Sequence, residues 1–137
     1  MNTKWLLYIR QFEGFAPLPY KDSTGHLTVG YGHNLDVPLS KQGALKLLEL
    51  DVRTARENVA RAFTWFEKLN EVRQFVLVDM CFNMGLKKLS TFKKFLAALE
   101  VKNYDLAAQE MLNSRWALQV GRRARILAEM MKIGAYK

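Results

Sequence analysis

The sequence has a single cysteine, Cys81, among its 137 residues, so a disulfide within the chain is excluded. Cys81 lies in an apolar helical run, where a cysteine more often packs as a small hydrophobe than acts as a nucleophile. Only two histidines accompany it. With so few nitrogen and sulfur ligands, a metal site is not expected.

Long apolar runs are also missing. No run approaches the ~20 apolar residues of a membrane-spanning helix, and residues 1–10 lack the apolar core and cleavage site of a signal peptide. We therefore expect synthesis and folding in the cytoplasm and no stable membrane insertion. If the target lies outside that compartment, another component must release the protein.

Repeats, low-complexity segments and flexible linkers are absent, and there are only three prolines. Half of the residues are apolar and a quarter are charged, which is typical of a globular domain and excludes global disorder. The length suits one domain. We expect a single domain over residues 1–137, present as a monomer.

Acidic residues are scarce relative to basic ones: 13 against 21, a formal net charge of +8. Such a surface favours anionic partners. Nucleic acid, anionic lipid and an acidic wall polymer all fit this description, so charge alone does not choose among them.

Helical periodicity covers most of the chain. A first helix begins after Asn2 or Thr3 and stops at Gly14, and a long helix begins after Ser40. Residues 64–67 form a capping-box pattern before another short helix. The run Val72–Met84 is apolar nearly all round and predicts a central buried helix that ends at Gly85. Further helices are expected over residues 91–100, 105–112 and 122–133.

The segment after Gly14 breaks this period. Residues 22–25, Asp-Ser-Thr-Gly, favour a turn between two short strands, with Leu27 and Val29 on one strand face and Thr28 on the other. The predicted class is α+β, mainly α, in two lobes. A small hairpin lobe covers about residues 14–39, the helical lobe covers 40–137 with the helix over 3–13 packed on it, and a cleft is expected between the lobes.

Two carboxylates lie in unlike settings, one just before this hairpin and one in its turn. Glu13 ends a helix, where the helix dipole and apolar neighbours such as Phe15 disfavour its ionised form. Asp22 lies in a polar turn where backbone N–H groups keep a carboxylate ionised, and the Thr28 hydroxyl can hold a water. A general acid, a base and a held water suit single-displacement hydrolysis of a glycosidic bond, with the carboxyl groups roughly 6.5–9.5 Å apart. Taken one at a time, these residues are more often an exposed helix end, a turn residue and a strand residue.

The motif as a whole favours the catalytic interpretation of these residues, because it resembles the bacteriophage T4-type lysozymes, the endolysin muramidases of glycoside hydrolase family 24. The resemblance rests on Glu13-Gly14, residues 20–25 (YKDSTG) and residues 27–33 (LTVGYGH). It extends through residues 71–85 to Ser114-Arg115-Trp116 and residues 122–125 (RRAR). It implies a lysozyme-like fold and a muramidase that uses no metal or cofactor, with Glu13 as general acid and Asp22 and Thr28 holding the attacking water.

The resemblance implies further roles. Asp79 and Asn83 share one helix face; the matching family positions are amides that line the cleft, although internal hydrogen bonds explain such residues equally well. Arg123 matches an arginine that approaches the catalytic glutamate, and His33 is expected to form a structural ion pair with Asp51. The predicted substrate-binding residues are Asn34, Asp79, Phe82, Asn83 and Arg123.

One departure from the family is plain: only residues 34–39 separate His33 from Ser40, where T4-type members carry a considerably longer segment. The small lobe is therefore expected to be short. Bacterial peptidoglycan is the expected substrate. Two alternatives stay open: a non-catalytic peptidoglycan-binding module derived from the same fold, and a small helical nucleic-acid-binding protein. Nucleic acid is not expected, because the chain has no recognition-helix motif.

Overall fold

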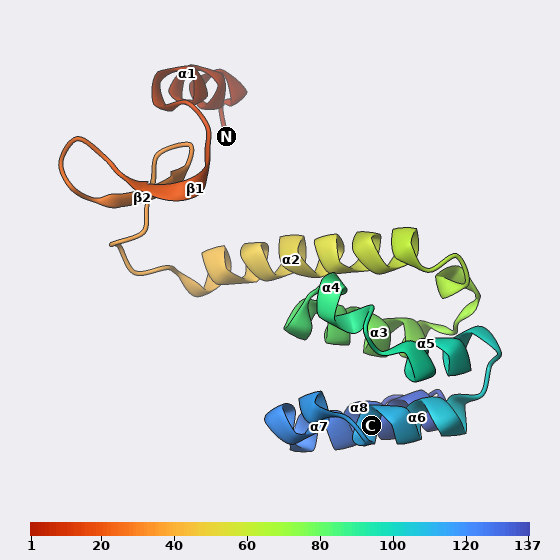
Figure 1. Ribbon diagram of the computed structural model, residues 1–137. Coiled ribbons are helices and arrows are strands. Elements are labelled where there is room, and N and C mark those ends of the chain that lie inside the picture. Colours follow the sequence, from red (N-terminus) through yellow and green to blue (C-terminus); the bar gives the residue numbers. More distant parts are fainter. The chain divides into compact units, whose positions relative to one another are not determined.

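A computed structural model describes all 137 residues and divides them into two compact units, Met1–Lys46 and Leu47–Lys137. The boundary lies inside the long helix α2 (Lys41–Ala62), which both units share (Figure 1). The structure is mainly helical with one small antiparallel sheet, which confirms the predicted α+β class. None of its helices combines the length and the apolar character needed to cross a membrane.

Unit 1 begins with a helix that is capped at both ends. The Asn2 side chain accepts a hydrogen bond from the backbone N–H of Lys4 at 2.9 Å, and Gly14, at φ +70°, ends the helix through its N–H bond to the carbonyl of Arg10. The Arg10 guanidinium lies over the ring of Tyr31, 5.2 Å from its centroid. The elements of this part are α1 (Thr3–Glu13), β1 (Ala16–Lys21), β2 (Leu27–Gly30) and β3 (His33–Asn34).

The sheet has three strands rather than the two that the sequence predicts. Tyr20 pairs with Thr28, and Thr28 in turn pairs with Asn34 on β3. A strand of two residues is too short to show an alternating pattern, so no local pattern predicts β3. The ladder between β1 and β2 is irregular between Ala16 and Tyr20, where Pro17 and Pro19 have no N–H to donate.

The core of unit 1 is sparse. Thr28 is its one buried residue, at 4% exposure, whereas no residue of α1 is buried and Phe12 is 81% exposed. The packing of residues 3–13 on the larger lobe stays a prediction. Ser40 caps α2 as expected, its Oγ accepting from the N–H of Gly43 at 3.0 Å.

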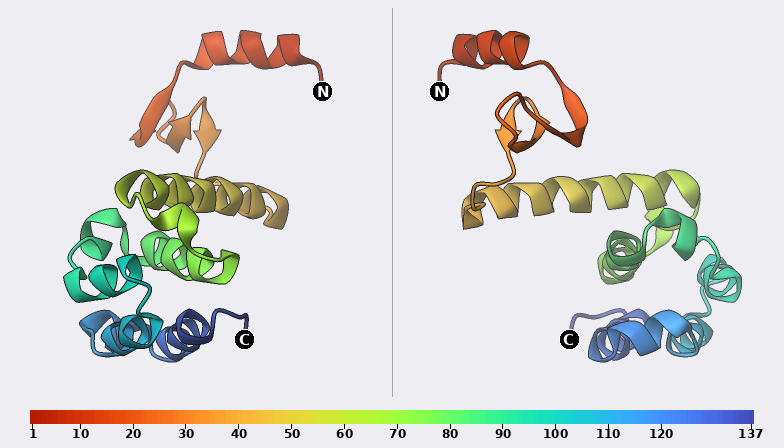
Figure 2. Two further views of the ribbon diagram at one scale, coloured as in Figure 1. Left: turned by 90° about the vertical axis from the view of Figure 1, so that its right-hand side faces the viewer. Right: turned by 60° about the vertical axis from the view of Figure 1, so that its left-hand side comes forward.

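Unit 2 contains the hydrophobic core, built around α3 as predicted. Val76, Leu77 and Met80 of α3 are fully buried, whereas Phe75 and Phe82, on its other faces, are each 41% exposed. In Figure 2, α6, α7 and α8 lie together at the C-terminal part of this unit. The elements after α2 are η1 (Phe66–Lys68), α3 (Glu71–Met84), α4 (Leu86–Leu89), α5 (Lys93–Glu100), α6 (Tyr104–Leu112), α7 (Arg115–Val120) and α8 (Arg122–Ile133).

Two sequence predictions for unit 2 need correction. The capping box at residues 64–67 does not form: no side chain caps η1, which is a 3-10 turn of three residues. The real cap lies at Asn70, whose Oδ1 accepts from the N–H of Arg73 at 3.0 Å and starts α3. The sequence does not predict the short helices α4 and α7, since four and six residues are too few for a helical period to show.

Candidate active site

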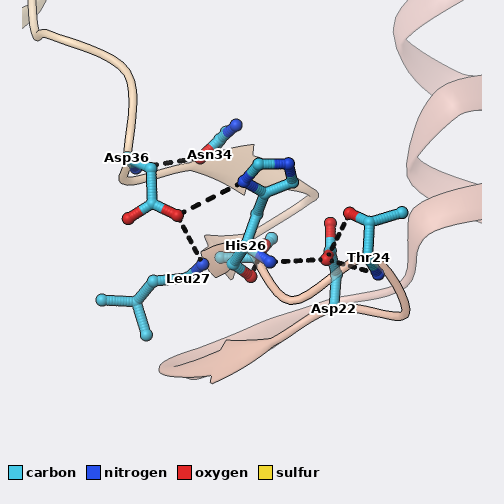
Figure 3. Close-up of polar contacts among 7 residues, drawn as sticks. Asp22, Thr24, His26, Leu27, Asn34 and Asp36 are labelled. Carbon is cyan, nitrogen blue, oxygen red and sulfur yellow. Dashed lines mark hydrogen bonds and ion pairs between the residues drawn. The ribbon is translucent and has the colours of Figure 1, made fainter.

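The turn between β1 and β2 is organised around Asp22 (Figure 3). One carboxylate oxygen of Asp22 accepts three hydrogen bonds, from the backbone N–H and the hydroxyl of Thr24 at 2.9 and 2.8 Å and from the N–H of His26 at 2.9 Å. The Asp22 N–H donates to the carbonyl of His26 at 2.9 Å, which closes the turn. Asp22 therefore has a fixed position, with its second carboxylate oxygen free of these bonds.

These hydrogen bonds also set the charge of Asp22. They lower its pKa below the ordinary value of 3.8, chiefly through the Thr24 hydroxyl and then the N–H of His26, while desolvation opposes them. Asp22 is thus a carboxylate, and not a carboxylic acid, over the whole range from weakly acidic to neutral pH. This is the state needed of a group that activates or positions a water.

We expect Thr24→Val to raise the pKa of Asp22 toward its ordinary value, because the largest stabilising hydrogen bond is lost. In the wild-type protein the lowered pKa stabilises the fold above the unfolded-state pKa, and this stabilisation is lost as the pH falls through the lower folded-state value. The carboxyl titration followed by NMR measures the shift. Ser23→Ala, which removes a hydroxyl not bonded to Asp22, is the matched control; equal pKa values in the two variants would contradict the assignment.

Thr28 is tied to the same turn. Its hydroxyl donates to the carbonyl of His26 at 3.0 Å, so the backbone of His26 connects the two residues predicted to hold water. The Thr28 side chain is buried. Its hydroxyl hydrogen is already donated to His26, so the hydroxyl oxygen can take part in a bond with water only as the acceptor. The role of Thr28 in catalysis stays a prediction.

A second carboxylate, Asp36, supports this arrangement from the segment after β3. Its Oδ2 accepts from the N–H of Leu27 at 3.1 Å and lies 3.4 Å from Nδ1 of His26 (Figure 3). Asn34, a predicted substrate-binding residue, accepts from the N–H of Asp36 at 2.8 Å through its Oδ1. Asp36 is not predictable from the sequence, because its contact with His26, ten residues away, leaves no local pattern.

Glu13 meets the sheet at Gly32. A Cβ placed on Gly32 would lie 2.6 Å from the carboxyl carbon and from one carboxylate oxygen of Glu13, so the carboxyl group rests directly on the Gly32 backbone. Gly32 has φ +77°, in the left-handed region that favours glycine. Glu13 is exposed, as are Phe12 and Phe15. Unit 1 by itself therefore does not provide the desolvation that the apolar neighbours predict around this carboxyl group.

In unit 2 the predicted substrate-binding residues bind to partners of their own. Arg123 holds Asp79 in a two-point ion pair, with Nε and Nη2 donating to the two carboxylate oxygens at 3.0 and 2.6 Å. The hydrogen bond to Asp79 raises the pKa of Arg123. Asn83 accepts from the indole N–H of the buried Trp116 at 2.9 Å. These contacts join α3 to α7 and α8; contact with substrate remains a prediction for all three residues.

Breaking the Asp79–Arg123 pair is expected to destabilise the protein. Arg123→Met should lower the free energy of unfolding by about 1–3 kcal/mol, because it leaves the half-buried Asp79 without its charged donor. Arg122→Met is the control, since Arg122 has the same charge but no ion-pair partner. Urea denaturation measures both variants, and equal unfolding free energies would show that the ion pair is not stabilising.

The remaining predicted residues lie in separate units. His33 is on β3 in unit 1, whereas Asp51 is on α2 in unit 2, so their ion pair stays a prediction. Asp51 and Phe82 line one hollow of about 310 Å³ between α2 and α3. Burial raises the pKa of the Cys81 thiol, which also borders this hollow, and the thiol is therefore an inert packing group.

Comparison with known proteins bears on nearly the whole chain. The sequence profile of the phage lysozyme family matches residues 10–130. Two relatives from Dictyostelium discoideum are "Probable T4-type lysozyme 2", 28% identical over 148 aligned positions, and "Probable T4-type lysozyme 1", 26% identical over 151. Each alignment covers 86% of this chain and 87% or 89% of the relative. Both alignments are longer than the 137 residues of this chain, so the relatives contain residues with no counterpart in it.

Proposed function

Because the chain belongs to the phage lysozyme family, we propose that it is a muramidase of peptidoglycan, which it cleaves at the β-1,4 bond between N-acetylmuramic acid and N-acetylglucosamine. The observation that supports this best is the contrast between two carboxylates of unit 1. Asp22 is held ionised by three hydrogen bonds, whereas the Glu13 carboxyl rests on the Gly32 backbone with no hydrogen bond to it. Two carboxyl groups in unlike environments are what acid and base roles require.

In this mechanism Glu13 protonates the leaving oxygen of the glycosidic bond. The Asp22 carboxylate and the Thr28 hydroxyl hold a water that attacks the opposite face of the sugar, so the reaction inverts the anomeric carbon. No metal or cofactor takes part. Asn34 pairs with Thr28 in the sheet and is proposed to contact the sugar there, with Asp79, Phe82, Asn83 and Arg123 contributing from unit 2.

The proposed biological role is that of an endolysin. The protein would be made in the host cytoplasm, released to the wall by another component, and would lyse the cell by cutting its peptidoglycan. Its net charge of +8 would favour adsorption to an anionic wall.

The test is the stereochemistry of the product on purified peptidoglycan. Proton NMR during the first minutes should show release of reducing ends in the α-anomer, since inversion of a β bond gives α. Release of the β-anomer would overturn the roles given to Asp22 and Thr28. Sedimentation with peptidoglycan without any release of reducing ends would instead favour a non-catalytic binding module. That alternative stays open because this chain lacks residues that its relatives contain.

A further inference from the structure

A basic hollow on unit 2 is lined by none of the residues given a catalytic or substrate role above. Its volume is about 470 Å³, and it opens between the α4–α5 segment and the α6–α7 segment. Four cations border it, and Glu110 is the one acidic residue on its wall. The basic residues are Lys88, Lys93, Lys94 and Arg115.

These four cations have no ion-pair partner. The ion pairs of the protein are His26–Asp36, Arg56–Glu67 and Arg123–Asp79, none of which involves the basic hollow. Lys88 donates only to the neutral side chain of Gln119, at 3.3 Å. Like charges gathered without ion-pair partners repel one another, so their arrangement around one concave surface does not stabilise the fold.

A neighbouring hollow on the same unit shows the contrast. The surface between α6 and α8 is lined by two acids, Asp105 and Glu129, and by two bases, Arg125 and Lys132. Its charges balance, as is usual for a solvated helical surface. Unit 2 carries 16 basic and 10 acidic residues, and half of its excess of six positive charges borders the basic hollow.

The position of Lys93 and Lys94 strengthens this point. They occupy the first turn of α5, where the helix dipole disfavours a positive charge, and no acidic residue accompanies them there. No side chain caps this end of α5. The N–H of Lys93 donates to the carbonyl of Thr91, whereas the N–H groups of Lys94 and Phe95 have no acceptor in the protein. By contrast, Ser114 caps α7 at the opposite wall. Both lysines and the free N–H groups favour an anion at this end of the hollow.

We propose that the basic hollow binds a polyol-phosphate chain, the phosphodiester polymer attached to many bacterial walls. The lysines and Arg115 would hold successive phosphates, and the apolar wall at Phe92 would contact the polyol carbons between them. The hollow is larger than one phosphate needs, which favours a chain over a single ion. The choice of a wall polymer rests on the proposed muramidase function, because that function brings the protein to the wall.

The test compares walls that retain their phosphodiester polymer with the same walls after hydrofluoric acid has removed it. All proteins carry Glu13→Gln, so that sedimentation measures binding without digestion. Lys93→Ser/Lys94→Ser should weaken binding to intact walls about tenfold, which corresponds to 1.4 kcal/mol. Lys4→Ser/Lys68→Ser removes the same charge from exposed lysines elsewhere and should weaken binding less than threefold. On stripped walls the two double variants should bind alike.

Equal weakening by both double variants on intact walls would show a net-charge effect only and would overturn the proposal. Lys93→Arg/Lys94→Arg should restore binding, and its failure to do so, with an unchanged thermal unfolding curve, would also overturn it. Two further probes are vesicles that contain phosphatidylglycerol and, separately, a DNA duplex. The two double Ser variants should bind each of these probes equally. A selective loss of binding by Lys93→Ser/Lys94→Ser would assign the hollow to a lipid surface or to nucleic acid. Hydrolysis by the protein with Glu13 intact is a separate measurement, so failure of the muramidase proposal does not affect this one.

Discussion

Glu13→Gln is expected to lower peptidoglycan hydrolysis by about 10²–10⁴-fold, because a glutamine cannot protonate the leaving oxygen. The substitution keeps the size and the exposed position of the side chain at the end of α1. Release of reducing ends from purified peptidoglycan measures the loss. Thermal unfolding should be nearly unchanged, since an exposed side chain with no ion pair contributes little to stability.

Glu57→Gln is the matched control for this experiment. Glu57 is an exposed glutamate on α2 without an ion-pair partner, so the substitution changes the net charge equally and should leave the rate near that of the wild-type protein. Hydrolysis by Glu13→Gln at the control's rate would remove Glu13 from the role of general acid. A loss in both variants would point to net charge and not to proton transfer.

Gly32→Ala should lower activity nearly as much, through position and not through chemistry. The new methyl group would lie 2.6 Å from the Glu13 carboxyl group, so the carboxyl group has to move. A displacement of about 1 Å at a reacting group costs on the order of 10²-fold in rate. The positive φ of Gly32 adds a backbone penalty of roughly 1–2 kcal/mol in stability for any L side chain.

Gly30→Ala separates these two effects. Gly30 has φ +69°, close to the +77° of Gly32, but a Cβ there has no atom within 4 Å. Both variants should lose similar stability, measured by thermal unfolding, while only Gly32→Ala should lose most of its rate of reducing-end release. Equal rates in two folded variants would show that the contact between Gly32 and Glu13 is not needed for hydrolysis.

The elements that the sequence predicts well are those with a local physical cause. Ser40 caps α2 and Gly14 ends α1 because caps depend on one or two neighbouring residues. The central burial of α3 follows from apolar residues on nearly every face. Asp22 accepts the backbone N–H groups of its own turn, a pattern typical of an aspartate at that position. Local hydrogen bonds and periodicity require no knowledge of distant partners.

The Thr24 hydroxyl has the largest effect on the Asp22 pKa, and the Asp-Ser-Thr-Gly turn contains the signal for it. By contrast, the partners of Asp79 and Asn83 lie 44 and 33 residues away, on α8 and α7. From the sequence, sugar contact and internal hydrogen bonds were equally good explanations for both residues. Helix packing then placed Arg123 and Trp116 beside them.

By itself the sequence determined the class of fold, the order of most helices, the turn that holds Asp22 and the resemblance that the family profile confirmed over residues 10–130. Only the tertiary structure showed that Asp36 supports the hairpin, that Glu13 rests on Gly32, and that four cations without ion-pair partners border one hollow. The physical reason is the range of the interactions. Turns and caps depend on neighbours in sequence, whereas contacts between elements depend on packing, which no local pattern encodes.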